Sequence, residues 1–227
     1  MNFRIFVLAL STFAFGSGAL IFVGLLEPMA ADLGVSVGAA GQLQTVYVLT
    51  SAFAGPPLAF LIGRFERKQV LLIALGVSAA LNLACYLTPG FGTILILRAV
   101  LGAIAAMAGP AASAAASALA PPERRGSSLA IVMGGMTVAF LMGIPLGSVV
   151  GSAFGWRSAF LLSTGLSAVA LIAIALFVPR VTPPAPGPGQ GLKGAGVLPL
   201  FAATFLAFGA NMTITTYIAP ILRLQIG

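Results

Sequence analysis

The chain has 227 residues, of which 59% are hydrophobic and 7% are charged, and its mean hydropathy is +1.11. A soluble domain usually has about 25% charged residues, so this sequence could not cover a water-facing surface. The formal net charge of +7 would suit a nucleic-acid binder only with a polar surface around it, and here the positive residues sit between apolar runs. We therefore expect no nucleic-acid partner.

The sequence also restricts the chemistry. It has no histidine and one cysteine, Cys85, inside an apolar run. Zinc and iron–sulfur sites lack their usual ligands, and an intrachain disulfide cannot form. The Ser–His–Asp and Cys–His types of nucleophilic catalysis lack a base. We expect no catalytic residue, no metal and no other cofactor, and an intramembrane enzyme is the least favoured class.

Seven apolar stretches are long enough to cross a membrane as helices, which needs about 20 mostly apolar residues. They are too long and too uniformly apolar for barrel strands. The predicted helices cover residues 4–26, 38–62, 69–87, 91–118, 128–154, 158–178 and 196–222. The first run exceeds the roughly 7–15 apolar residues of a signal peptide, so we interpret it as an uncleaved span. The fold class is an all-α polytopic membrane protein.

Lys and Arg gather in every second gap between these runs. One set of gaps holds Arg4, Arg64, Arg67, Lys68, Arg124, Arg125, Arg180 and Lys193, and the opposite set holds Arg157. Cytoplasmic loops collect Lys and Arg, so the pattern predicts a cytoplasmic N-terminus. We expect a multi-pass protein of the plasma membrane, the inner membrane of a bacterium, with the lipid bilayer as its environment.

The stretch from Val178 to Gly196 is rich in Pro and Gly, which is typical of a flexible, partly extended linker. It separates six predicted helices from a seventh. The predicted domains are a six-helix bundle over residues 1–178, a cytoplasmic linker over 179–195 and the seventh helix within 196–227.

Polar residues form stripes on two predicted helices. Gln44, Tyr47 and Ser51 recur at spacings of three and four and so share one face, as do Asn211 and Thr215 in the last helix. These stripes suit the lining of a wet central cavity for a substrate. Interhelical hydrogen bonding explains them equally well, and the spacing leaves both open.

Two charged residues near membrane depth are candidate functional residues. Arg98 lies about two turns into its helix, where a guanidinium is costly unless it faces a cavity or a partner. The alternative is that its long side chain reaches the lipid headgroups. Glu27 is a candidate proton site, because proton coupling needs a carboxylate that burial keeps protonated. An ordinary solvated carboxylate is the alternative for Glu27.

The helix over residues 128–154 carries small residues at every fourth position. They are Gly135, Ala139, Gly143, Gly147 and Gly151. They share one face, which lets another helix approach closely and needs no transport function. Pro145 lies within the run and is expected to bend or loosen the helix.

Three segments occur in the order "LAFLIGRFERKQVLL" (58–72), "LRAVLGAIAA" (97–106) and "GIPLGSVVG" (143–151). Together they resemble the major facilitator superfamily, especially its drug and sugar efflux branch, the arabinose-efflux-like permeases. The first resembles the loop signature that gates the cytoplasmic side. Its basic positions are held by Arg64, Arg67 and Lys68. Gly63 replaces the usual Asp and Glu66 the usual Gly, so we expect Glu66 to supply the missing carboxylate.

The other two segments carry further expectations from the same resemblance. Arg98 and Gly102 match the helix 4 signature, in which the Arg is implicated in proton or substrate handling. The third segment is a variant of the antiporter signature, with Ile144 between Gly143 and Pro145, and Gly147 and Gly151 following. That signature marks exporters, so the resemblance implies efflux of a small organic solute, such as a drug or sugar, by proton antiport.

The family fold is two six-helix bundles joined by a long cytoplasmic linker. By this resemblance the chain holds the N-terminal bundle plus helix 7, the first helix of an incomplete second bundle. Substrate binds between the halves in such folds, and transport rocks one half against the other. The chain is therefore expected to be truncated. Its partner would be the missing C-terminal half, and without that half we expect no transport.

Two other classes remain. A seven-helix receptor or photoreceptor fits the helix count, but a retinal protein needs a Lys in the last helix and the nearest, Lys193, lies in the linker. The predicted orientation is also opposite to that of a receptor. A non-transporting membrane fragment or assembly partner is the other alternative. It predicts that Arg98 and Gln44 can be replaced without a phenotype.

Overall fold

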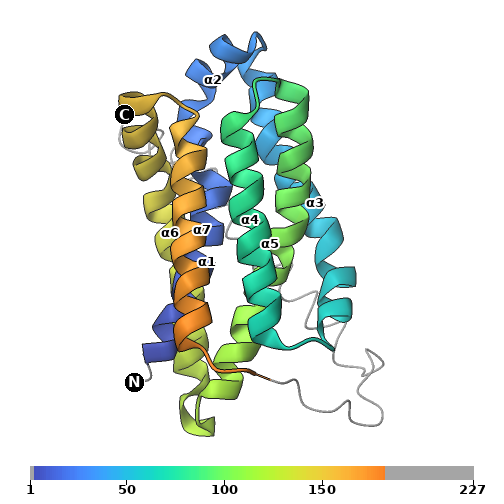
Figure 1. Cartoon of the computed structure of the whole chain (residues 1–227), viewed down its shortest axis with the longest axis vertical. Helices are drawn as coiled ribbons and strands as arrows, with labels where there is room; N and C mark the ends of the chain where they lie inside the picture. Colours follow the sequence, from blue (N-terminus) through green and yellow to red (C-terminus); the bar gives the residue numbers. More distant parts are fainter. Residues whose placement is uncertain (1–2, 182–227) are drawn as a thin grey trace, which may run out of the picture. The chain divides into compact units, whose positions relative to one another are not determined.

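The structure, a computed structural model, describes residues 3–181 apart from the side chain of Phe60. Its elements are α1 (Phe3–Leu20), the 3₁₀ helix η1 (Val23–Leu25), α2 (Leu26–Leu33), α3 (Val37–Ile62), α4 (Arg67–Leu87), α5 (Phe91–Leu119), the 3₁₀ helix η2 (Pro122–Arg124), α6 (Arg125–Phe154) and α7 (Ser158–Phe177). Every regular element in the described range is helical (Figure 1). The all-α fold class is confirmed, while the predicted linker and the helix over 196–222 lie outside the described residues.

Long apolar helices dominate the described range. Within it, five stretches are long and apolar enough to cross a membrane: Phe3–Leu33, Arg67–Leu87, Phe91–Leu119, Pro122–Phe154 and Ser158–Phe177. Helix α3 has 26 residues, comparable to these spans. It contains Pro56 and Pro57 and still continues to Ile62. The predicted spans of residues 38–62, 69–87, 91–118, 128–154 and 158–178 agree with α3 to α7 within a few residues.

The first predicted span, residues 4–26, is wrong as a single helix. Helix α1 ends at Leu20, and the chain turns through η1 before α2 begins at Leu26. The sequence has no proline before Pro28, and its apolar residues continue without interruption, so composition does not reveal the break. The last carbonyl groups of a helix lack intrahelical donors. The break therefore leaves carbonyl oxygens of α1 available to other helices.

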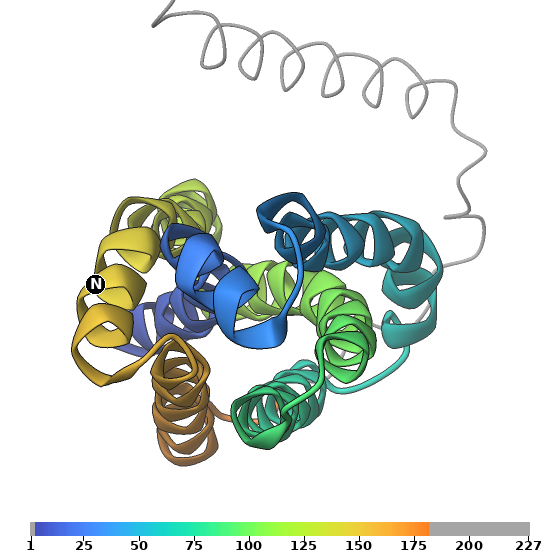
Figure 2. The same cartoon turned by 90° about the horizontal axis from the view of Figure 1, so that it is seen from above.

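The helices pack as a bundle in which some pairs are closer than others. Helix α1 packs mainly on α6, and α3 packs mainly on α5. Helix α4 lies between α5 and α7, and α7 also contacts α1. Figure 2 looks onto one end of this bundle, where the short helix α2 lies across the ends of the longer helices. We call this the α2 end.

Glycines set the two closest helix contacts. A methyl group on Gly135 or Gly147 of α6 would overlap the carbonyl oxygen of Ala9 or Ile21 respectively. In the same way a methyl group on Gly102 of α5 would overlap the carbonyl oxygen of Tyr47 in α3. Small residues let helix backbones approach this closely in membranes. The pairs α1–α6 and α3–α5 are therefore held at separations that larger residues would not allow.

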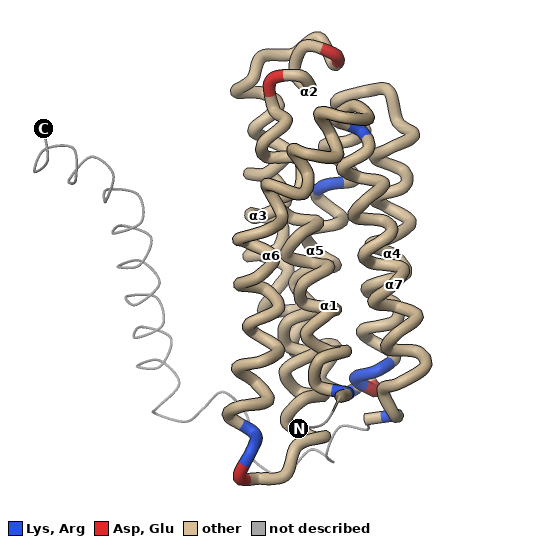
Figure 3. Tube along the Cα trace, turned by 90° about the vertical axis from the view of Figure 1, so that its left-hand side faces the viewer, with Lys and Arg blue, Asp and Glu red and all other residues tan. Residues whose placement is uncertain are grey.

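Charged residues lie almost entirely at the two ends of the bundle (Figure 3). The end opposite α2, which we call the basic end, contains the start of α1, the α3–α4 loop, the α5–α6 turn and the end of α7. Its cations are Arg4, Arg64, Arg67, Lys68, Arg124, Arg125 and Arg180. The α2 end carries Glu27, Asp32 and Arg157. This distribution is what a cytoplasmic basic end would show, and the orientation itself stays a prediction.

Candidate functional site

Arg98 is completely buried inside the bundle, about two turns into α5. Its Nη1 donates a hydrogen bond to the Gly18 carbonyl oxygen at 3.0 Å, and Nη2 donates to the Ala19 carbonyl oxygen at 3.1 Å. Nη2 also donates to Oε1 of Gln44 on α3 at 3.2 Å. The guanidinium thus donates hydrogen bonds to carbonyl groups that have no intrahelical donor where α1 ends. It joins α1, α3 and α5, and its side chain turns into the bundle rather than toward the headgroups.

Two aromatic rings cover the Arg98 guanidinium. Its central carbon lies 4.5 Å from the ring centroid of Phe22 and 4.3 Å from that of Tyr47. The ring faces carry negative charge density, so each attracts the cation, and more strongly when water is excluded. Phe22 also stacks on Phe160 of α7, with ring centroids 5.8 Å apart. We call Arg98, Phe22, Gln44 and Tyr47, with the carbonyl groups of Gly18 and Ala19, the Arg98 cluster.

The positive charge of Arg98 has no carboxylate partner among the residues that the structure describes. Its Nε is buried and has no hydrogen-bond partner there. A charged group at membrane depth is costly and commonly marks a functional site. Here neutral oxygens and ring faces surround it in place of a counter-charge.

The predicted cavity residues divide into three groups. Gln44 and Tyr47 belong to the Arg98 cluster, so their polar stripe takes part in interhelical contacts. Ser51, one turn further along α3, is partly exposed. Asn211 and Thr215 lie outside the described residues, and so their role as cavity residues stays a prediction.

The predicted gating loop holds several helix ends together at the basic end. Nη1 of Arg67 donates to the carbonyl oxygen of Ile62 at 3.0 Å, at the end of α3. Nζ of Lys68 donates to the carbonyl oxygen of Ala175 at 2.8 Å, in the last turn of α7. Cations are favourable at helix C-termini, because the peptide dipoles leave partial negative charge there. Two basic residues of the loop therefore act on neighbouring helices of the same bundle.

The remaining loop residues differ in their surroundings. Oε1 of Glu66 accepts a hydrogen bond from the backbone N–H of Val181 at 3.0 Å. Gly63 is partly exposed and Arg64 is exposed. The resemblance implies that Glu66 supplies the carboxylate missing from the loop signature, and the hydrogen bond seen here is with a backbone amide.

The residues of the antiporter-like segment lie on two sides of α6. Gly143 and Gly147 are buried against the Ser17–Ile21 part of α1, and Gly151 is buried against the Leu25 side chain. Pro145 is exposed on the other side, and α6 runs without interruption from Arg125 to Phe154. This segment therefore contacts the same part of α1 that supplies carbonyl oxygens to Arg98.

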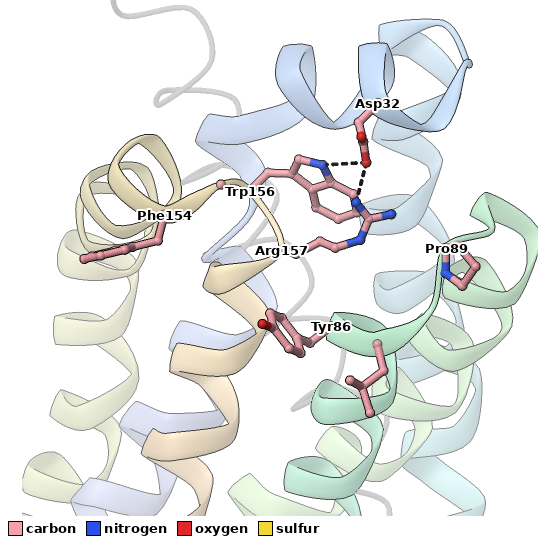
Figure 4. A pocket seen from close by; sticks show the side chains of 8 residues that line it. Asp32, Tyr86, Pro89, Phe154, Trp156 and Arg157 are labelled. Carbon is pink, nitrogen blue, oxygen red and sulfur yellow. Dashed lines mark hydrogen bonds and ion pairs between the residues drawn. The ribbon is translucent and has the colours of Figure 1, made fainter.

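The α2 end has a polar cluster that sequence reasoning did not single out. Asp32 of α2 forms an ion pair with Arg157, and its Oδ2 accepts a hydrogen bond from Nε1 of Trp156 at 3.1 Å. The Arg157 guanidinium also lies over the Trp156 ring, 4.3 Å from its centroid. Figure 4 shows these contacts beside an open pocket of about 540 Å³, with Tyr86 and Pro89 on its other side. The cluster fixes α2 to the α6–α7 turn.

Glu27 lies apart from both polar clusters. It is exposed in the first turn of α2, at the α2 end of the bundle. Its exposed setting resembles that of an ordinary solvated carboxylate, the alternative raised by the sequence. Its role as a proton site stays a prediction.

Several participants in these clusters had no signal in the sequence. Phe22 is one of many apolar residues in its run, and Gly18 and Ala19 act through backbone oxygens. Ser17 and Ser163 have buried hydroxyl oxygens without hydrogen-bond partners in the described part of the chain. The sequence could have suggested this ion pair, because Asp32 and the Arg157 of the "GWR" turn are oppositely charged residues at the same end of the bundle.

Comparison with known proteins gives a consistent result. The family described as Major Facilitator Superfamily matches residues 7–227. The uncharacterized MFS-type transporter YfhI of Bacillus subtilis (strain 168) is 32% identical over 231 residues, which cover 100% of this chain and 58% of that relative. A probable sugar efflux transporter of Mannheimia succiniciproducens is 28% identical over 232 residues, covering 99% and 57%.

A further relative is the purine ribonucleoside efflux pump NepI of Escherichia coli O6:K15:H31. It is 29% identical over 206 residues, covering 88% of this chain and 51% of that relative. The chain thus spans between 51% and 58% of the length of these three proteins.

Proposed function

Since this chain belongs to the major facilitator superfamily, we propose that it forms the N-terminal part of a secondary transporter that exports a small organic solute in exchange for protons. Its family and its apolar helices make it a multi-pass protein of the plasma membrane. The efflux direction is supported by relatives named for sugar and purine ribonucleoside efflux. Both kinds of solute are polar and rich in hydroxyl groups, and we propose such solutes as the first candidates.

The observation that carries the proposal is the Arg98 cluster. A buried guanidinium, with no carboxylate partner among residues 3–181, joins the broken end of α1 to α3 and α5. In this geometry a small change in charge or hydration beside Arg98 alters the contacts of three helices at once. That is the arrangement needed to couple a proton or a substrate to helix movement, because a ligand shifts a conformational equilibrium through its different contacts in the two states.

Transport by this fold needs two bundles, because the substrate site lies between them and one rocks against the other. We therefore propose that residues 1–227 act together with a C-terminal half. Proteoliposomes containing the 227-residue chain alone should show no flux. Proteoliposomes containing it joined to a C-terminal half should export radiolabelled sugars or ribonucleosides, driven by an inward proton gradient and abolished by a protonophore.

A matched variant makes this experiment specific. Arg98→Ala in the joined protein should abolish flux, whereas the exposed substitution Glu123→Gln should leave it unchanged. Flux by the 227-residue chain alone would contradict the need for a second bundle. Normal flux with both Arg98→Ala and Gln44→Ala would contradict the role given to the Arg98 cluster. No flux in the joined parent protein would favour the alternative function, a non-transporting membrane partner.

A further inference from the structure

The chain does not leave the bundle directly where α7 ends. After Phe177 it continues without helix or strand from Val178 to Val181, which lies against the start of α4. The side chains of Val178 and Val181 are 2% and 6% exposed and belong to the same apolar cluster as Val70 and Leu71 of α4. This short segment is thus part of the bundle core, although it comes after the last helix of the bundle.

Both backbone polar groups of Val181 are bonded to consecutive residues at the start of α4. Its N–H donates to Oε1 of Glu66, and its carbonyl oxygen accepts from the N–H of Arg67, both at 3.0 Å. The first N–H groups of a helix have no partner within the helix. Val181 therefore satisfies one of the free donors of α4 and receives a carboxylate acceptor in return.

Glu66 is placed unusually for this purpose. It is the N-cap residue of α4, with extended backbone angles (φ −64°, ψ 127°), and its side chain makes no capping hydrogen bond to its own helix. Its carboxylate reaches outward to Val181 instead. A carboxylate oxygen at a helix N-terminus lies close to the free N–H groups of the first turn, and it is also a good acceptor for a neighbouring backbone amide.

The neighbouring residues connect this contact to other helix ends. Arg67 donates to Ile62 at the end of α3, and Lys68 donates to Ala175 in the last turn of α7. Consecutive residues 66 to 68 therefore hold the exit segment, α3 and α7 around the start of α4. A pull on the chain beyond Val181 would act on all three through this one short stretch.

We propose that Glu66 is a positioning residue that anchors the exit segment Val178–Val181, and thereby fixes where the chain leaves the first bundle. It acts as a hydrogen-bond acceptor for a backbone amide rather than as a charged partner of the basic residues in the loop. The inference does not depend on transport, because the anchor is a property of residues within the first bundle.

The test measures how often the exit segment detaches. A cysteine at Val181 of the full 227-residue chain is buried and reacts with a maleimide only after local opening, whereas Cys85 is fully buried and stays unreactive. In Glu66→Ala the labelling rate at residue 181 should rise about tenfold or more, the factor that corresponds to the loss of one charge-assisted hydrogen bond. In Glu66→Gln it should rise clearly less than in Glu66→Ala, because the amide oxygen still accepts, although without the charge.

Two controls accompany this comparison. Glu123→Ala removes an exposed carboxylate from another turn of the basic end and should leave the rate at residue 181 unchanged. A separate cysteine at the exposed Ser127 should react at one rate in all Glu66 variants. The rate at Ser127 thus controls for the reagent, whereas labelling of the buried Cys85 would reveal general unfolding rather than local detachment.

The outcomes separate the possibilities. An unchanged rate in Glu66→Ala would overturn the proposal, and equal acceleration in Glu66→Gln and Glu66→Ala would show that the charge, not the acceptor, matters. If Glu66→Ala fails to fold, hydrogen exchange in the unmodified chain decides. The Val181 amide should exchange slowly, as a hydrogen-bonded group does, and rapid exchange would contradict the anchor.

Discussion

Gly147 of α6 lies against the carbonyl oxygen of Ile21, so closely that a methyl group at residue 147 would overlap it. Ile21 follows the last residue of α1, at the break in the first membrane segment. The contact therefore places the backbone of α6 directly beside the part of α1 whose carbonyl groups bind Arg98. Packing between α1 and α6 and the geometry of the Arg98 cluster depend on each other.

Replacing Gly147 by Ala should destabilise the bundle. The added methyl group has to displace the backbone of Ile21, and overpacking of this kind typically costs about 1–3 kcal/mol. Thermal unfolding of the purified chain in detergent should show a lower midpoint for Gly147→Ala. Gly134→Ala is the matched control, because Gly134 lies on the same helix with open space around it. It should unfold at or above the parent temperature, and an equal loss in both variants would contradict the packing argument.

Replacing Arg98 by Ala should both destabilise the bundle and prevent transport. The substitution leaves the part-buried oxygens of Gly18, Ala19 and Gln44 without their donor, at about 1–3 kcal/mol for each of them that stays shielded from water. Arg98→Lys should recover only part of the stability, because an ammonium group cannot bond both carbonyl groups and Gln44 from one plane between two rings. Thermal unfolding should give midpoints that decrease from the parent to Arg98→Lys and then to Arg98→Ala. Equal stability of Lys and parent would show that charge alone matters.

The ion pair between Asp32 and Arg157 should be coupled weakly. Both side chains are substantially exposed, at 48% and 30%, and water and salt screen such pairs. A double-mutant cycle with Asp32→Asn and Arg157→Gln should give a small favourable coupling that decreases as salt is raised. Glu27→Gln, which changes another carboxylate of α2, should show no coupling to Arg157→Gln. A large coupling that salt does not affect would contradict this account.

Labelling from the two sides of the membrane should establish the orientation. Cysteines at Ser127, beside the α5–α6 turn, and at Ser152, near the end of α6, lie at opposite ends of one helix and are both exposed. In intact cells an impermeant maleimide should label residue 152 and not residue 127, and permeabilised cells should show both. The reverse pattern would overturn the predicted cytoplasmic N-terminus.

Most of the fold could be predicted from the sequence because lipid imposes a simple rule. A buried backbone must bond within its own helix, so long apolar runs separated by charged turns indicate where the helices lie. The helices α3 to α7 follow that rule closely. The break after Leu20 does not, because the donors that compensate it come from Arg98, which lies far along the chain. A contact between such distant residues leaves no trace in local composition.

The candidate site was predicted in part, for a similar reason. Arg98 and Gln44 are polar residues in apolar helices, and a polar residue at membrane depth needs a partner. The sequence therefore indicates that each of them needs a polar partner, but it does not show that they bond to each other. Glu66 shows the opposite case. Its departure from the family pattern drew attention to it, but its partner is the backbone of Val181, and a backbone partner has no side-chain identity to recognise.

The Arg98 cluster also bears on how this bundle can move. Helices α1 and α6 form one tight pair, and α3 and α5 form another, and in each pair glycines let the two backbones approach closely. From within the second pair, Arg98 bonds the backbone of the first. Sliding of one pair along the other would have to break those two bonds, so this single guanidinium resists shear between the two pairs.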